Sequence, residues 1–150
     1  PGSARPPRAG SPLIGASAMY VKREPLLSPE HERLVTRCID VGIAVHRELG
    51  PGFIKKIYQR AYCLELGTRG IRFEAEKRID VRYRHWRIPG QTVDLVVEGV
   101  LLVELKAIPR LRPLHESQVR SYLKTMGLRV GLLMNYNVRL LKDGLRRVVF

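Results

Sequence analysis

Three charged residues interrupt two otherwise apolar stretches of the sequence. Asp94 lies among valines and a leucine in residues 92–97, and every residue of 100–107 except Glu104 and Lys106 is apolar. Burying unpaired charges costs several kcal/mol, so a central strand rarely carries them without a reason. Two carboxylates that converge can hold a hard divalent cation such as Mg²⁺ or Mn²⁺, and an ammonium beside them suits phosphodiester hydrolysis.

Each of these groups has a role in that hypothesis. Asp94, Glu104 and the main-chain carbonyl of Leu105 would be the metal ligands, and Lys106 would orient or deprotonate a water and offset transition-state charge. The alternative is a structural ion pair that joins Lys106 to Glu104 or to Asp94. Such a short string occurs by chance in many proteins, and its position on an apolar hairpin flanked by helices is what favours catalysis.

The turn at residues 98–99 decides whether the carboxylates meet. A two-residue loop would pair Asp94 with Val103 and place Glu104 on the opposite face of the hairpin. A three-residue loop with Gly99 in the left-handed conformation, or a bulge there, places Asp94 and Glu104 on one face. We therefore predict an odd-length, bulged turn.

Periodicity and chain breakers predict the surrounding elements. Ser28-Pro29-Glu30 predicts a helix start, and apolar residues at helical spacing continue to about Leu49. Further helices are predicted at about 53–69 and from Pro113 to Gly127. Strands are predicted near 79–83, 92–97, 100–107 and 130–135 and at the C-terminus, with turns at Pro89-Gly90 and Asp143-Gly144. The order ααβββαββ predicts an α/β domain over residues 28–150, after a disordered, basic, Pro- and Gly-rich tail over residues 1–27.

The chain is strongly basic, with a net charge of +13 and an isoelectric point near 10.4. Residues 106–150 contain ten basic residues and two acidic ones, so they carry much of the excess. A surplus of this size indicates a polyanionic partner such as nucleic acid. The alternative is a solvated basic face without a partner.

Several basic residues are placed to contact phosphates. Arg110 and Arg112 directly follow the candidate catalytic strand, and Arg120 and Lys124 lie on the third predicted helix. Trp86 stands among arginines near a predicted hairpin tip, where the cations can hold a phosphate backbone and the indole can stack on a base. An exposed strand edge protected by charge is an equally good explanation of that tip.

Other features limit the class of protein. Cys38 and Cys63 lie in separate predicted helices and show no CxxC spacing, which favours a reducing compartment and a cytoplasmic location. No apolar run approaches the length of a membrane span, so no contact with a membrane is expected. The sequence leaves the oligomeric state open, and a homodimer is compatible with it.

A series of short blocks runs in one order through most of the chain. The blocks are His46-Arg47-Glu48-Leu49-Gly50-Pro51-Gly52, Tyr58, Gly70-Ile71-Arg72-Phe73-Glu74, Asp94-Leu95-Val96-Val97, Val103-Glu104-Leu105-Lys106-Ala107, His115-Glu116-Ser117-Gln118, Tyr122-Leu123 and 127–133. With these blocks the chain from about His31 to Phe150 resembles the GxxExxY proteins, a branch of the PD-(D/E)xK nuclease superfamily.

The resemblance implies both a fold and an activity. The fold would be a restriction-endonuclease-like core, with a mixed β-sheet flanked by helices. Asp94, Glu104 and Lys106 would be the catalytic positions, and Gln118 from the third helix would support the site. The activity would be that of a metal-dependent nuclease acting on DNA, in repair, recombination or defence against foreign DNA.

Lys55 departs from the family pattern. It stands between Gly52 and Tyr58 at the position of the Glu that gives the family its name. In related nucleases a Glu from an early helix adds a carboxylate to the metal site. Here an ammonium would compete with the metal, turn outward, or bind a substrate phosphate as a point charge. Glu48 and Glu65 are acids that could partly replace the missing carboxylate.

Three functions are therefore compatible with the sequence. The first is a metal-dependent nuclease acting on DNA. The second is a degenerate member that binds nucleic acid without cutting it, because Lys55 prevents metal binding. The third is an interaction or assembly protein whose basic surface meets acidic partners.

Overall fold

The helices begin and end where the sequence supplies capping residues. In the computed structural model, which describes residue 2 and residues 27–150, the first helix is α1 (Pro29–Leu49). The Oγ of Ser28 accepts a hydrogen bond from the N–H of His31 at 3.1 Å, which satisfies one of the free N–H groups at the helix start. Gly50 follows the helix with φ of 64°, a value that glycine adopts without strain. The predicted tail, residues 1–27, lies almost wholly outside the described residues.

The other elements follow in the predicted order. They are α2 (Lys55–Thr68), β1 (Phe73–Tyr83), β2 (Trp86–Val97), β3 (Leu101–Lys106), α3 (Pro113–Met126), β4 (Val130–Asn135), the short 3₁₀ helix η1 (Leu141–Gly144) and β5 (Leu145–Val149). The strands form one sheet in the order β1-β2-β3-β4-β5. Only β3 and β4 are parallel, because α3 carries the chain from the end of β3 back to the start of β4. The predicted α/β fold, a mixed sheet flanked by helices, is confirmed.

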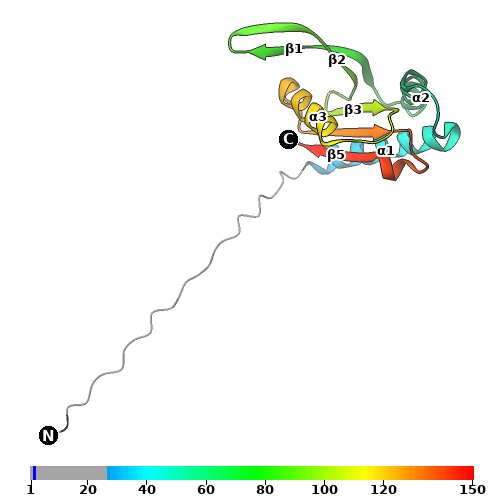
Figure 1. The fold of residues 1–150 in the computed structure, drawn as a ribbon, viewed down its shortest axis with the longest axis horizontal. Helices are drawn as coiled ribbons and strands as arrows, with labels where there is room; N and C mark the ends of the chain where they lie inside the picture. The colour runs from blue at the N-terminus through cyan, green and yellow to red at the C-terminus, as the bar shows by residue number, and fades with distance from the viewer. Residues whose placement is uncertain (1, 3–26) are drawn as a thin grey trace.

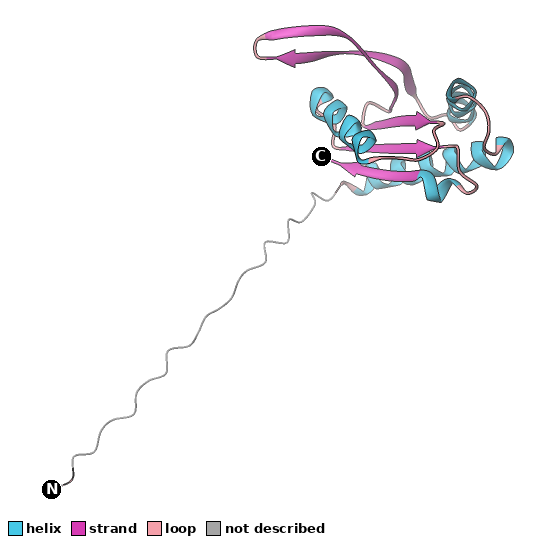
Figure 2. Cartoon of the chain, viewed as in Figure 1, coloured by secondary structure: helices cyan, strands magenta, loops and turns pink. Residues whose placement is uncertain are grey.

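Helices cover both faces of the sheet (Figures 1 and 2). One apolar cluster joins buried residues of α1 and α2, such as Val41 and Tyr62, to Leu105 of β3. A second cluster joins Val119 and Leu123 of α3 to the opposite face. Each face of the sheet therefore has its own core, and charged residues that remain buried between these layers need a specific partner.

The hairpin of β1 and β2 corrects one prediction. Pro89-Gly90 was predicted to be a turn, but both residues lie inside β2 and the chain reverses after Tyr83 instead. The register changes by one residue at this place, since a single residue of β1, Asp80, lies opposite Pro89 and Gly90 together. A proline that donates no ladder hydrogen bond and a glycine with φ of 117° suit such a bulge as well as they suit a turn.

The last connection is also longer than predicted. β4 and β5 are antiparallel neighbours, as a hairpin requires. However, the chain between them runs through residues 136–144 and includes η1, so Asp143-Gly144 is the end of a 3₁₀ helix and not a tight turn.

The outer half of the β1–β2 hairpin, residues 80–90, projects from the rest of the fold as a two-stranded ribbon (Figures 1 and 2). We call this segment the arm. Every residue in it is exposed. Among the helices of the described residues, none is long and apolar enough to cross a membrane.

Candidate active site

The turn between β2 and β3 contains three residues, 98–100. Val97 and Leu101 form the last pair of the hairpin, and the N–H of Val100 donates to the carbonyl of Val97 at 3.0 Å. Gly99 has φ of 67°. The predicted odd-length turn with Gly99 in the left-handed conformation is therefore confirmed.

This turn sets the register that brings the two carboxylates together. Leu95 pairs with Val103, so the next residues along, Asp94 and Glu104, lie opposite each other. Both are buried, with exposed fractions of 8 % and 6 %. The two acids that the sequence indicated on separate strands, Asp94 and Glu104, thus lie next to each other in the sheet.

At this point the two strands are joined by hydrogen bonds from main-chain N–H groups to carboxylate side chains. The main-chain N–H of Asp94 donates to Oε1 of Glu104, and the N–H of Leu105 donates to Oδ2 of Asp94, each at 2.9 Å. A carboxylate that accepts a main-chain hydrogen bond is held in a fixed position. The two acidic side chains therefore lie at a fork between β2 and β3, where each is anchored by the opposite strand.

Burial and a neighbouring acid disfavour the ionised form of Glu104. Burial, followed by the negative charge of Asp94, raises the pKa of Glu104 to about 7, although the hydrogen bond from Asp94 and the ammonium groups of Lys55 and Lys106 act in the opposite direction. Near neutral pH Glu104 is consequently close to gaining a proton. Any cation that binds beside it is favoured for the same electrostatic reason.

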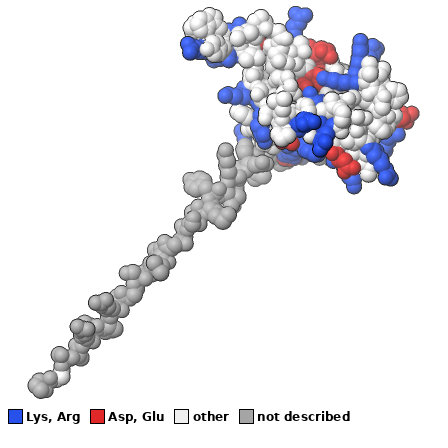
Figure 3. Space-filling view, in the orientation of Figure 1, with Lys and Arg blue, Asp and Glu red and all other residues white. Residues whose placement is uncertain are grey.

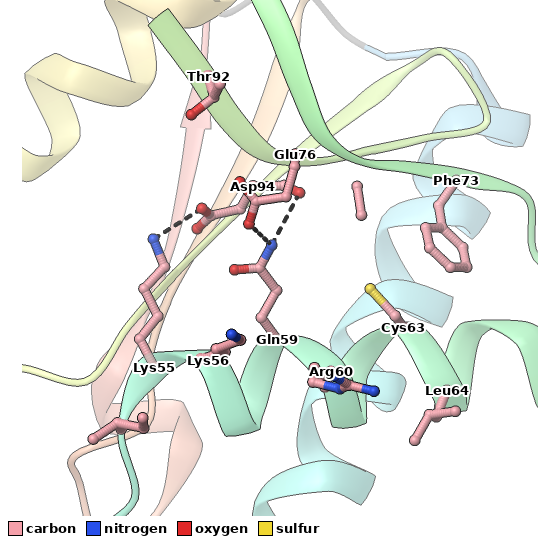
Figure 4. A pocket seen from close by; sticks show the side chains of 12 residues that line it. Lys55, Lys56, Gln59, Arg60, Cys63, Leu64, Phe73, Glu76, Thr92 and Asp94 are labelled. Carbon is pink, nitrogen blue, oxygen red and sulfur yellow. Dashed lines mark hydrogen bonds and ion pairs between the residues drawn. The ribbon is translucent and has the colours of Figure 1, made fainter.

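Lys55 occupies the cation position in this structure. It is the first residue of α2, and its Nζ lies 2.8 Å from Oδ1 of Asp94 (Figure 4). Neither ion pair that the sequence allowed for Lys106 is formed among the described residues, and Asp94 pairs with Lys55 instead. Of the alternatives for Lys55, the outward orientation is wrong: the side chain points into the site.

A tyrosine fixes the start of α2 and therefore the position of Lys55. The hydroxyl of Tyr58 donates to the carbonyl of Gly50 at 2.6 Å and accepts from the N–H of Phe53 at 3.1 Å. Tyr58 is fully buried, and its ring stacks on Tyr136 with centroids 4.5 Å apart. Tyr58 thus stabilises the segment that links α1 to α2. Its spacing from Gly52 in the sequence reflects this role.

Two further residues at the site were missed by the sequence analysis. Nε2 of Gln59 donates to Oε1 of Glu76 at 2.8 Å and lies 3.5 Å from the main-chain oxygen of Asp94 (Figure 4). Gln59 follows Lys55 by one helical turn, and that spacing could have indicated a shared face. Glu76 lies across from Asp94 in the register of β1 and β2, which the sequence does not reveal.

Glu76 is the additional acid near the site, in place of the two that the sequence suggested. Glu65 pairs instead with Arg69 on the same helix, at 3.0 Å. Glu48 is exposed near the end of α1, and no contact joins it to Asp94.

The third helix also approaches the carboxylates, mainly through Tyr122. Its hydroxyl accepts from Nε2 of Gln91 at 3.1 Å. Burial, and then the charges of Glu104 and Asp94, raise the pKa of Tyr122. Gln118 lies one turn earlier on α3, half-buried and without a hydrogen bond to another described residue, so its supporting role stays a prediction.

The predicted phosphate-binding residues are all exposed. Arg110 and Arg112 belong to the segment between β3 and α3, and Arg120 and Lys124 are one turn apart on α3. Basic side chains outnumber acidic ones on the face shown in Figure 3. Trp86 is separate from this group, because it lies near the tip of the arm.

A pocket of about 920 Å³ opens beside Asp94, between α2 and the strands β1 and β2 (Figure 4). One end is polar, with Asp94 and Glu76 near Lys55. The other end is largely apolar and includes Phe73 and Leu64. The pocket therefore gives a ligand access to the buried Asp94 from the surface.

The donor atoms fit a hard divalent cation in kind, since carboxylate and main-chain oxygens are the ligands that Mg²⁺ prefers. Three of the four oxygens of Asp94 and Glu104 accept hydrogen bonds from Lys55, Leu105 and Asp94 itself. Within the described residues no group of three or more His, Cys, Asp or Glu side chains is arranged to hold a metal. A metal that binds Asp94 would therefore compete with the ammonium of Lys55.

A mixed five-stranded sheet that carries an acid on one strand and Glu-x-Lys on the next defines the class of restriction-endonuclease-like nuclease folds. Comparison with family models agrees, because the model of the PD-(D/E)XK nuclease superfamily matches residues 32–148. The chain belongs to this superfamily. No curated protein and no solved structure matches it.

Proposed function

We propose that this protein is a metal-dependent phosphodiester hydrolase that acts on DNA. The observation that carries the proposal is the contact between Asp94 of β2 and Glu104 of β3, with Lys106 two residues beyond Glu104 on the same strand. Two adjacent buried carboxylates, of which Asp94 lines an open pocket, are a usual means of placing a divalent cation against a phosphodiester. The superfamily match supports the nuclease class, and the net charge of +13 supports a polyanionic substrate.

Each residue has a defined part in this chemistry. Asp94, Glu104 and the carbonyl of Leu105 would hold Mg²⁺ or Mn²⁺, which when bound supplies Lewis-acid activation of the phosphate. The ammonium of Lys106 stabilises negative charge that develops on the phosphoryl oxygens. Exposed Arg110, Arg112, Arg120 and Lys124 bind the flanking phosphates and carry no sequence information.

The finer assignment to the GxxExxY branch is part of the proposal. It is supported by Gly52 and Tyr58, which flank Lys55 at the family spacing. Gly52 has φ of 112°, which excludes most other residues there. The free thiols of Cys38 and Cys63 support a reducing compartment, consistent with a cytoplasmic protein.

A cleavage assay tests the activity. Single-stranded and double-stranded DNA, with RNA in parallel, are incubated with the protein and Mg²⁺ or Mn²⁺. We expect cleavage that Asp94→Asn and Lys106→Ala each abolish and that Arg139→Ala, a change at an exposed arginine outside the site, leaves intact. Cleavage that survives both site substitutions would show that the activity belongs to a contaminant.

The ion pair between Lys55 and Asp94 favours a second candidate function, nucleic-acid binding without cleavage. An ammonium 2.8 Å from Asp94 opposes the entry of a dication. If the wild-type protein binds DNA but does not cut it, Lys55→Glu distinguishes a blocked nuclease from a site without catalytic capacity. Cleavage by the variant supports the blocked nuclease, whereas an inactive variant that binds metal rejects it.

A further inference from the structure

The arm has two faces of opposite character. In the ladder between β1 and β2, Val81 pairs with Ile88 and Tyr83 pairs with Trp86, while Arg82 pairs with Arg87 between them. Residues that lie directly opposite share a face, and successive pairs alternate. One face of the arm is therefore apolar and the other carries two arginines.

Much of the apolar face is exposed to solvent, and the ring of His85 packs against Trp86 with centroids 3.7 Å apart. Its four side chains, Val81, Tyr83, Trp86 and Ile88, have exposed fractions between 40 % and 55 %. The rings of Tyr83 and Trp86 are stacked, with centroids 6.4 Å apart and planes at 17°. A row of large apolar groups on a projecting ribbon, rimmed by charge, is typical of a surface that binds a partner.

The arginines on the opposite face of the arm indicate which class of partner it binds. Arg82 and Arg87 are directly opposed like charges, which destabilise a two-stranded ribbon. Arg84 at the turn adds a third positive charge, and its guanidinium carbon lies 5.4 Å from the ring centre of Tyr83. Asp80 is the single acid within residues 80–90. A second copy of this arm would be repelled, whereas nucleic acid offers both phosphates and flat apolar bases.

The arm is continuous with the candidate active site. Trp86 and Asp94 lie on the same strand, eight residues apart, which corresponds to at most roughly 26 Å along the strand. At the base of the arm, the hydrogen bond between Gln91 and Tyr122 ties β2 to α3. A nucleic-acid strand that enters the site can therefore reach the arm several nucleotides from the phosphate held there.

We propose that the arm binds unpaired bases of the nucleic acid that flank the candidate active site. Bases stack on the apolar face formed by Tyr83 and Trp86, and Arg82, Arg84 and Arg87 bind the adjoining phosphates. Stacking needs exposed base faces, which a closed duplex does not offer, so the arm selects single-stranded or splayed substrate. This inference rests on the proposed nucleic-acid substrate and not on cleavage.

Trp86 is the only tryptophan in the chain, so its fluorescence reports on the arm alone. The probe is an oligothymidylate of about 20 nucleotides, longer than the roughly 4–16 that one such surface covers, titrated in EDTA at low salt. A blunt duplex of the same length is the comparison. We expect saturable quenching by the single strand and little by the duplex. Absence of quenching, or equal quenching by both, overturns the proposal.

Variants of the stacked pair provide the second readout. Tyr83→Ala should weaken binding of the single strand about tenfold, as the loss of one stacked base predicts. Tyr83→Phe, which keeps the ring, should bind like the wild type, and so should Arg139→Ala. Equal binding by Tyr83→Ala and the wild type overturns the proposal.

The test separates this proposal from the proposed function. Because EDTA removes divalent cations, quenching does not require a working nuclease. Quenching by a protein that never cleaves supports the arm and rejects the hydrolase. Cleavage of DNA without quenching does the opposite.

Discussion

The Nζ of Lys55 lies 2.8 Å from Oδ1 of Asp94 and provides the positive charge that this buried acid needs when no metal is bound. The ammonium comes from the start of α2, whose position depends on the hydrogen bonds of Tyr58 to the preceding segment. A carboxylate at the same position would add a ligand for a metal. We therefore expect the identity of residue 55 to control how strongly the site binds a metal ion.

Replacing Lys55 should strengthen metal binding. Charges of +1 and +2 that lie about 5 Å apart repel by about 1.7 kcal/mol even at the dielectric constant of water, which corresponds to about 15-fold in affinity. We therefore expect Lys55→Gln to bind Mn²⁺ about 15-fold more tightly than the wild type, measured by calorimetry without nucleic acid.

Lys56 provides the matched control for that measurement. It lines the same pocket, is exposed, and forms no ion pair with another described residue. Lys56→Gln changes the net charge equally and should leave the affinity for Mn²⁺ nearly unchanged. Similar gains in both variants would mean that overall charge, and not the contact with Asp94, controls the metal.

Glu104 should make the metal-free protein less stable as the pH rises. Its folded-state pKa is raised from 4.5 to about 7, so between these values the folded state binds more protons than the unfolded state. Stability consequently falls as pH rises from about 4.5 to 7, by an amount on the order of 2 kcal/mol.

Glu104→Gln removes this titration and keeps an oxygen that can accept from the N–H of Asp94. Urea unfolding in EDTA at pH 5 and pH 8 should therefore show a smaller loss of stability for the variant than for the wild type. An identical pH dependence in both proteins would place the titrating group elsewhere.

The sequence predicted those parts of the site that depend on local alternation. Asp94 and Glu104 could be placed on one face because only the number of residues in the turn at Gly99 mattered. Glu76 could not be placed, because its approach to Asp94 depends on the register of a separate strand. The phi angle of 53° at Glu76, unusual for a residue other than glycine, also has no sequence signal.

The fold was likewise predictable where local sequence signals determine it. Helix α1 begins at Ser28-Pro29 as predicted, because a hydroxyl cap followed by a proline in the first turn is typical of a helix start. The prediction of a turn at Pro89-Gly90 was wrong, since this dipeptide suits a bulge as well as a turn. The choice between them was made by the cross-strand pairs of the arm, which lie beyond the dipeptide in both strands.

Tyr58→Phe should destabilise the protein. The substitution leaves the carbonyl of Gly50 and the N–H of Phe53 without the hydroxyl that now bonds both. Losing the partner of a part-buried polar group costs about 1–3 kcal/mol. Tyr83→Phe is the control, because Tyr83 is exposed and its hydroxyl forms no hydrogen bond with another described residue.

Denaturant unfolding measures the difference between these two variants. We expect a clear fall in the free energy of unfolding for Tyr58→Phe and almost none for Tyr83→Phe. Since Tyr58 positions the start of α2, Tyr58→Phe should also shift the Mn²⁺ affinity toward that of Lys55→Gln. Full stability in Tyr58→Phe would show that the two hydrogen bonds do not hold this segment.

Arg82→Glu should have opposite effects on stability and on nucleic-acid binding. It converts the like-charged pair with Arg87 into an attractive cross-strand pair, which contributes about 0.2–1 kcal/mol relative to a neutral pair. The same change removes a phosphate contact and adds a repulsive charge, so the variant should bind oligothymidylate more weakly. The slope of log affinity against log salt concentration should also be shallower, by about 0.7 for the lost phosphate contact.

Hydrogen exchange of the arm amides measures the effect on stability, and fluorescence titration at several salt concentrations measures the effect on binding. Arg139→Ala should change neither. Unchanged binding of oligothymidylate by Arg82→Glu would show that the arginine pair does not bind a phosphate backbone.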